Sequence, residues 1–279
     1  MSTITANETE QIRIANESGK QPVLFIHGLW LLASSWDAWR SYFESHGYAT
    51  VAADWPGDEA DVASALKNKD SLAGVGVQEV TDHLADVARA LTVKPIVIGH
   101  SFGGLLVQRL ADLGLATVTV AIDPAPFKGV LPLPASALKA SFPVLGNPAN
   151  RKKTVTLTFD QFRYGFANAV SEDEAKALYA GFHTPAPGRP LFQAASANVT
   201  SGIATKIDVK NPDRGPLLVI SGERDNIVPF KMADAAYRLQ SKNEALTRFV
   251  EIPGRGHSLV IDSGWEGVAS EALEFVAAI

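Results

Sequence analysis

The chain has 279 residues, of which 46% are hydrophobic and 20% are charged, and its formal net charge is -5. A chain of this size can bury a large core, so it suits one big α/β domain with an insertion or two smaller domains. The mildly acidic net charge gives no sign of a basic surface that would bind nucleic acid or an anionic membrane. The lack of cysteine excludes disulfides, thiolate catalysis and cysteine-ligated metals.

No targeting or membrane segment is visible. The first twenty residues are polar, and no later apolar run approaches the ~18 residues of a membrane span. We therefore expect a cytoplasmic protein that acts on a small molecule, with neither nucleic acid nor membrane as a partner. The oligomeric state is open.

Short apolar runs alternate with amphipathic segments. Ser34 or Ser35 is expected to cap a helix in which Trp36, Trp39 and Phe43 share one face. Further helices are expected over 80–91, directly after residue 101, and over 265–276. The apolar runs predict strands at 22–26, 49–53, 95–99, 117–122, 216–220 and 247–252. Near-continuous apolar strands separated by helices indicate a parallel sheet covered on both faces, with ligands beyond the carboxyl ends of the strands.

One long stretch interrupts this alternation. From about 127 to 214 the sequence is rich in proline and shows only two helical pieces, near 158–168 and 172–182. It is too long for a plain loop. We expect a cap over residues 128–212, with a core formed by 1–127 and 213–279.

The run GHSFG at 99–103 fits the pattern G-x-S-x-G. Small residues are needed beside a serine on a sharp strand-to-helix turn, because the helix packs close to the strand. The free backbone N–H groups of the helix N-terminus also suit a developing oxyanion. The predicted strand before it and helix after it favour Ser101 as a nucleophile over an ordinary turn.

A serine hydroxyl needs a base, and six histidines are candidates. His257 lies in the glycine-rich run GRGHS at 254–258, just past the last predicted strand. Its loop can therefore cross the top of the sheet. His46 and His83 are most simply solvated helix residues, and His100 points away from Ser101 by the geometry of a tight turn. We therefore expect His257 to be the base.

An acid must orient His257. Asp225 follows the buried strand that directly precedes the one leading to His257, so it is the preferred candidate. Asp123, which also ends a strand, and Glu223 are rivals. Both aspartates keep the order serine, acid, histidine.

With these residues in place, the chain resembles the α/β-hydrolase superfamily over nearly its whole length. The matching pieces, in order, are FIHG at 25–28, GHSFGG at 99–104, SGERD at 221–225 and GH at 256–257. The resemblance implies an α/β fold, a mostly parallel twisted sheet flanked by helices, with a helical cap inserted after the sixth strand. It also implies that the backbone N–H groups of Leu29 and Phe102 form the oxyanion hole.

The resemblance also narrows the chemistry. Haloalkane dehalogenases and epoxide hydrolases of this fold carry aspartate where this chain has Ser101, and the HGGG run of some lipases is absent. A serine esterase acting on a small ester or lactone, without cofactor or metal, is the expected function. Expected pocket residues, for each of which plain core packing is the alternative, are Trp30, Phe142, Phe162 and Phe166.

Two other functions fit the same residues. Cofactor-free perhydrolases and haloperoxidases use the same three side chains and react the acyl-serine with peroxide. Some members of the fold are non-catalytic small-molecule receptors. The sequence does not separate these from an esterase, because the difference lies in the shape of the pocket.

Overall fold

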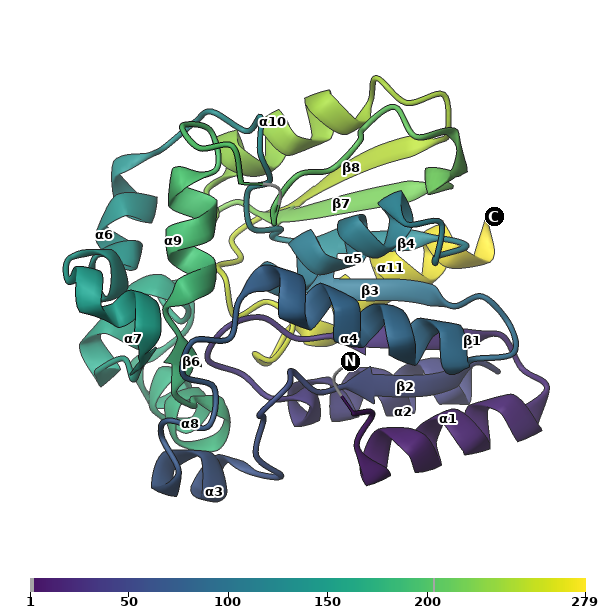
Figure 1. Ribbon diagram of the computed structural model, residues 1–279, viewed down its shortest axis with the longest axis horizontal. Helices are drawn as coiled ribbons and strands as arrows, with labels where there is room; N and C mark the ends of the chain where they lie inside the picture. The colour runs from purple at the N-terminus through teal and green to yellow at the C-terminus, as the bar shows by residue number, and fades with distance from the viewer. Residues whose placement is uncertain (1–2, 203) are drawn as a thin grey trace.

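A six-stranded parallel sheet forms the centre of the computed structural model, which describes residues 3–202 and 204–279 (Figure 1). The strand order is β2-β1-β3-β4-β7-β8, and every neighbouring pair is parallel. The strands are β1 (Pro22–Ile26), β2 (Ala49–Ala53), β3 (Ile96–His100), β4 (Thr119–Ile122), β7 (Leu217–Gly222) and β8 (Thr247–Ile252). The predicted parallel sheet is confirmed, and each strand begins within two residues of its expected start.

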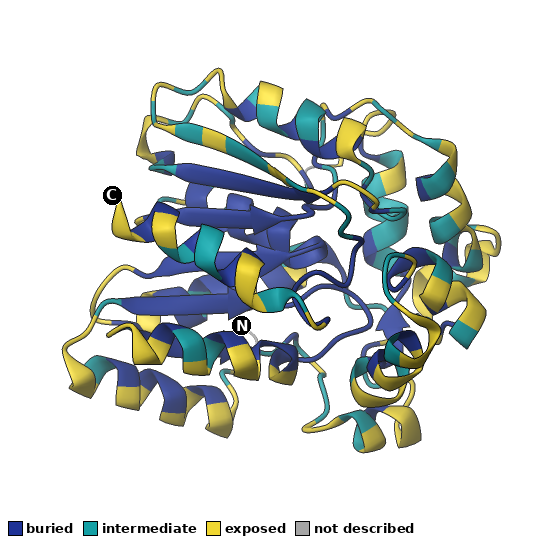
Figure 2. Cartoon of the chain, turned by 180° about the vertical axis from the view of Figure 1, so that it is seen from behind, coloured by how far each residue is buried: buried dark blue, intermediate teal, exposed yellow. Residues whose placement is uncertain are grey.

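Helices cover both faces of the sheet, as its fully buried strands require. Strands β1, β2, β3, β4 and β7 are buried along their whole length, whereas the edge strand β8 is only partly buried and exposes Arg248 and Glu251. Helices α4 (Val77–Ala90) and α5 (Phe102–Asp112) lie on the face toward the viewer in Figure 1. Helices α2 (Asp37–Ser45) and α11 (Trp265–Ala277) lie on the other face, seen in Figure 2. Helices α3 (Val62–Lys67) and α10 (Phe230–Gln240) also lie outside the segment between β4 and β7.

The aromatic face expected near residue 36 is present, but its expected cap is not. Trp36, Trp39 and Phe43 are all buried and pack around Phe25. Neither serine caps α2, because a short 3₁₀ turn, η1 (Ala33–Trp36), comes first and the Ser35 hydroxyl donates to the carbonyl of Leu32, just before that turn.

The sequence did not predict the N-terminal helix α1 (Ala6–Ser18), which begins with a capping box between Thr5 and Glu8. Glu8 and Gln11 accept hydrogen bonds from the backbone N–H groups of Asp54 and Ala52 along the edge strand β2. Helix α1 thereby covers an edge that would otherwise be open. The helix also corrects the interpretation of His83, which is 1% exposed and bonded to Glu8 at 2.8 Å rather than solvated.

The segment between β4 and β7 gathers beyond the carboxyl ends of the strands (Figure 1). It follows the fourth strand in chain order, not the sixth, because the residues before Pro22 form α1 instead of further strands. Its elements are α6 (Ala135–Leu145), η2 (Pro148–Lys152), β5 (Thr154–Val155), α7 (Phe159–Gly165), α8 (Glu172–Phe182), β6 (Ala186–Pro187) and α9 (Arg189–Ser196). Within the described residues, no helix is both long and apolar enough to cross a membrane.

Candidate active site

Ser101 lies on a strained turn between β3 and α5. Its backbone has φ 58° and ψ -120°, a conformation that non-glycine residues rarely adopt and that clusters at functional sites. A Cβ at Gly99 would lie 2.2 Å from the Gly103 carbonyl oxygen, and one at Gly103 would lie 2.0 Å from that of Ile26. Only glycine therefore fits on either side of the turn, which accounts for the spacing of the G-x-S-x-G pattern.

The loop after β1 lies directly against Ser101. A Cβ at Gly28 would be 2.7 Å from the Ser101 Cβ and 3.3 Å from its Oγ. The next residue, Leu29, is buried, and Phe102 begins α5, where the first N–H groups have no partner within the helix. The two expected oxyanion residues thus adjoin Gly28 and Ser101, respectively.

His257 and Asp225 form a buried pair. The His257 Nδ1 lies 2.5 Å from the Asp225 Oδ2, and the Asp225 Oδ1 accepts the backbone N–H groups of Ile227 and Val228 at 2.6 and 2.9 Å. The His257 ring packs on the ring of His100, with 4.5 Å between centroids. Because His100 precedes Ser101, this contact brings the base to the carboxyl end of β3. The His257 Nε2 has no hydrogen-bond partner among the described residues.

Asp123, the rival acid, is the second carboxyl group near His257. Its Oδ2 lies 4.0 Å from the His257 Nδ1, while its Oδ1 accepts the Gly222 N–H at 2.7 Å. Burial, and then the charge of Asp225, raise the pKa of the Asp123 carboxyl well above its usual value. The raised pKa disfavours the charged form of Asp123, and Asp225, which bonds the His257 Nδ1 directly, is better placed to balance a charged His257.

Among the described residues, one cluster of side chains could hold a metal ion, and it includes His257 and Asp123. Ligand atoms of His100, Asp123 and His257 lie within 4.8 Å of one another. The His257 nitrogen nearest Asp123 is already bonded to Asp225. Only the Nε2 of this ring is open to a metal, and that is the atom a general base needs, so the arrangement fits an acid–base pair better than a metal centre.

A sequence model of the Alpha/beta hydrolase family matches residues 23–272. The chain belongs to the α/β-hydrolase family. Similar solved structures include the monoacylglycerol lipase of Paleococcus ferrophilus, which is 19% identical with a TM-score of 0.63 and coverage of 92% of this chain and 94% of that one. An extracellular α/β-hydrolase from a Paenibacillus species is 22% identical with a TM-score of 0.64 and coverage of 91% and 98%. A methylesterase protein from Arabidopsis is 15% identical with a TM-score of 0.62 and coverage of 93% and 100%. At these identities the likeness establishes the shared fold.

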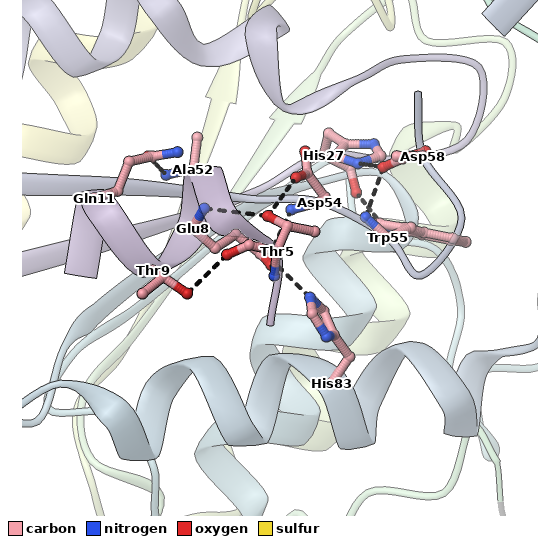
Figure 3. Close-up of polar contacts among 10 residues, drawn as sticks. All are labelled: Thr5, Glu8, Thr9, Gln11, His27, Ala52, Asp54, Trp55, Asp58 and His83. Atoms are coloured by element: carbon pink, nitrogen blue, oxygen red, sulfur yellow. Dashed lines mark hydrogen bonds and ion pairs between the residues drawn. The ribbon is translucent and has the colours of Figure 1, made fainter. Parts of the chain in front are cut away.

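In this α/β-hydrolase a second buried histidine holds the loop beside Ser101 (Figure 3). The His27 Nδ1 lies 2.8 Å from the Gly28 carbonyl oxygen, and its Nε2 lies 2.9 Å from the Asp58 Oδ2. Burial alone lowers the pKa of His27, but the charge and hydrogen bond of Asp58 outweigh it and the pKa is raised. Since a carbonyl and a carboxylate both accept, both ring nitrogens carry hydrogen. The side chain is therefore an imidazolium paired with Asp58.

The position of this imidazolium matters because the Gly28 carbonyl and the Leu29 N–H belong to one planar peptide group. Holding the carbonyl oxygen therefore also orients the N–H at the other end. Sequence reasoning missed Asp58, whose only signal is its place in a turn after β2. Its Oδ2 also accepts the Trp55 N–H at 2.6 Å, which fixes that turn.

Buried carboxylates connect this loop to α1 (Figure 3). Asp54 lies between Asp58 and Glu8, and burial followed by the charges of these two neighbours raises its pKa to about 6. Glu8 in turn pairs with His83 on α4. The N-terminal helix, the edge of the sheet and the His27 loop thus share one buried polar network.

The α/β-hydrolase core and the inserted segment enclose a largely apolar pocket above Ser101, with about 870 Å³ of unfilled space, part of it open to solvent. Its wall comes from the loop after β4, from α6 and α9, and from the turn after β7; it includes Phe102, Phe127, Leu138, Leu191, Ile227 and Met232. None of the four expected pocket aromatics lines it. Trp30, Phe162 and Phe166 are buried and pack on one another, with Phe166 4.9 Å from the His257 ring, whereas Phe142 is 70% exposed.

Proposed function

We propose that this α/β-hydrolase cleaves a small carboxylic ester or lactone through an acyl intermediate on Ser101. The observation that carries the proposal is the strained backbone of Ser101, which lies against Gly28 and directly follows His100, whose ring packs on His257. Strain of this kind persists where the surrounding structure imposes it. A structural serine would not need it.

The buried pair supports general base catalysis. His257 removes the Ser101 proton through its free Nε2 as Ser101 attacks the acyl carbonyl, and then protonates the leaving alcohol. Asp225 accepts the Nδ1–H of His257, selects this tautomer and stabilises the imidazolium that forms. Water repeats the sequence on the acyl-enzyme.

The backbone N–H groups of Leu29 and Phe102 are the proposed oxyanion donors. Their contribution depends on preorganisation, because donors already aimed at the developing charge need no reorganisation during the reaction. The His27–Asp58 pair supplies this order to the Leu29 peptide.

The inserted segment, residues 128–212, is proposed to be a cap that forms the roof of the substrate pocket. Its helices α6 and α9 contribute apolar side chains above Ser101, so an apolar acyl or alcohol group fits best. The monoacylglycerol lipase and the methylesterase among the similar structures are named for ester substrates, which agrees with this choice.

The proposal is tested with a fluorophosphonate probe, which reacts with an activated serine. We expect one stoichiometric adduct, and peptide mapping should locate it on Ser101. Short-chain p-nitrophenyl esters should be hydrolysed and should compete with labelling. A folded protein that is not labelled, or that is labelled at another residue, would contradict the assignment.

Replacing His27 with glutamine should lower kcat by about 10²-fold with little change in KM, because the Leu29 N–H loses its orientation. Steady-state kinetics on a p-nitrophenyl ester checks this. His83→Gln is a matched control, since His83 is equally buried but pairs with Glu8 on α1. We expect the control to lower stability and leave kcat unchanged; equal kcat losses in the two variants would remove the positioning role of His27.

A further inference from the structure

The most exposed apolar side chains gather around the mouth of the pocket. Among the described residues the four most exposed large apolar side chains are Val199 (85%), Leu131 (76%), Phe142 (70%) and Leu133 (63%). With Leu138, which is 48% exposed, we define these five residues as the rim. Isolated exposed apolar residues are ordinary, but a gathering of this kind marks a site of interaction.

The rim is held together as one surface. Leu131 and Leu133 precede α6, while Leu138 and Phe142 lie one turn apart on that helix. Asn198, the neighbour of Val199, ties the end of α9 to this loop through hydrogen bonds to the Gly129 N–H and the Val130 carbonyl, at 2.7 and 2.8 Å. The rim therefore spans the gap between α6 and α9.

The rim is also continuous with the pocket. Leu131, Leu133 and Leu138 each line the pocket that contains Ser101, so apolar surface runs from outside the molecule to the nucleophile. Phe142 does not line the pocket. It stands on the outer surface of α6, where a role in holding substrate does not account for it.

Basic residues are concentrated in the stretch of the chain that supplies most of the rim. Residues 124–159 contain five lysines and arginines and no aspartate or glutamate, although the whole chain has a net charge of -5. Lys139 lies on α6 with its Nζ 4.0 Å from the centre of the Tyr164 ring, and Lys128 bonds to the Thr200 carbonyl beside Val199. Arg151, Lys152 and Lys153 follow α6 and are exposed.

The charges on the neighbouring elements do not cancel this cluster. Helix α9 carries a single charged side chain, Arg189, which pairs with Glu79 on α4. The acidic residues of the inserted segment lie on α7 and α8, apart from Asp208, and Glu172 pairs with both Arg163 and Lys176. An apolar rim with unbalanced positive charge remains.

We propose that the rim docks on an anionic lipid–water interface, with its apolar side chains inserted and the flanking cations against the headgroups. A second copy of the chain fits less well, because a symmetric contact would bring two basic clusters together. The expectation of no membrane partner came from the net charge, which averages over the whole surface and hides this cluster. Delivery of ester from the interface to Ser101 rests on the proposed function, whereas docking itself does not.

Vesicle flotation with the full chain tests the proposal. The protein should float with vesicles of phosphatidylglycerol and phosphatidylcholine, bind pure phosphatidylcholine weakly, and release as salt rises. Using Ser101→Ala protein keeps hydrolysis out of the readout, so docking and catalysis can fail independently. Equal binding to both vesicle types, or none to either, would overturn the proposal.

Two sets of variants locate the binding surface. Phe142→Ser should weaken binding to anionic vesicles by about tenfold. The separate triple variant Arg151→Gln, Lys152→Gln, Lys153→Gln should weaken it by a similar factor. Leu246→Ser and a Lys20→Gln, Lys94→Gln pair are the matched controls, because these exposed residues lie just before β8, β1 and β3, at the opposite end of the sheet. Phe142→Ser should keep full activity on a soluble ester. Loss of binding in the controls would assign lipid binding to another surface. Concentration-dependent dimerisation that Phe142→Ser abolishes would make the rim a contact between copies of the chain instead.

Discussion

Ser101→Ala is expected to abolish ester hydrolysis without unfolding the protein. Removing the nucleophile of a serine hydrolase leaves only binding and the oxyanion donors, so kcat should fall by about 10⁴–10⁶-fold. The alanine keeps the Cβ that already fits beside Gly28. Steady-state kinetics with p-nitrophenyl butyrate, together with thermal unfolding, measures both effects.

Ser221 provides the matched control for this variant. It is a fully buried serine near the carboxyl end of β7, and its Oγ has no hydrogen-bond partner among the described residues. Ser221→Ala should retain activity. If Ser101→Ala kept more than a trace of activity, or if both variants lost it equally, Ser101 would not be the nucleophile.

Asp225→Asn is expected to slow hydrolysis by about 10⁴-fold while the protein stays folded. The amide cannot balance the charge of His257, and its N–H₂ group can favour the wrong tautomer. Asp123→Asn should cost less than about tenfold, because the Asp123 Oδ2 lies 4.0 Å from the His257 Nδ1 and the raised pKa of Asp123 disfavours its charged form. Kinetics of both variants on one ester decides between the acids.

The pH dependence of Asp225→Asn offers a further check. Removing the charge of Asp225 takes away one cause of the raised pKa of Asp123, which then ionises at lower pH than before. The ionised Asp123 can then act as the acid beside His257, so any residual activity of Asp225→Asn should increase with pH. That activity should disappear in the double variant Asp225→Asn, Asp123→Asn. A larger loss in Asp123→Asn than in Asp225→Asn would reverse the assignment.

The sheet could be predicted because most of its strands are nearly continuous apolar runs, β8 with Arg248 and Glu251 being the exception. The run 22–26 contains no polar residue that could face solvent. This is typical of a strand covered on both faces of the sheet. The turn at Ser101 could be predicted because close contact between backbones admits only glycine at Gly99 and Gly103. Local sequence records both constraints directly.

Helix α1 and the His27 network could not be predicted in this way. The buried residues of α1 include Glu8 and Gln11, whose partners on β2 and α4 lie 41 to 75 residues away. Polarity in the sequence therefore pointed to solvent. The pairing of His27 with Asp58 likewise depends on β1 and β2 being neighbours in the sheet.

The aromatic residues failed as pocket markers for a related reason. Phe162 and Phe166 stack on each other and Phe166 packs against the His257 ring, whereas Phe142 is exposed on α6. Aromatic character alone does not say on which side of a helix the pocket will lie. The smaller aliphatic residues of α6 and α9 line it instead.

The floor of the proposed active site is made of backbone, and its roof is made of side chains. At Gly28, Gly99 and Gly103 a single added carbon would collide with main-chain atoms or with Ser101, so the floor admits almost no variation. The roof comes from α6 and α9. Both helices belong to one continuous segment of the chain, which is inserted between β4 and β7. Substrate preference can thus change through substitutions in one contiguous stretch of the chain, which makes that stretch the natural target for combinatorial libraries or for exchange between relatives.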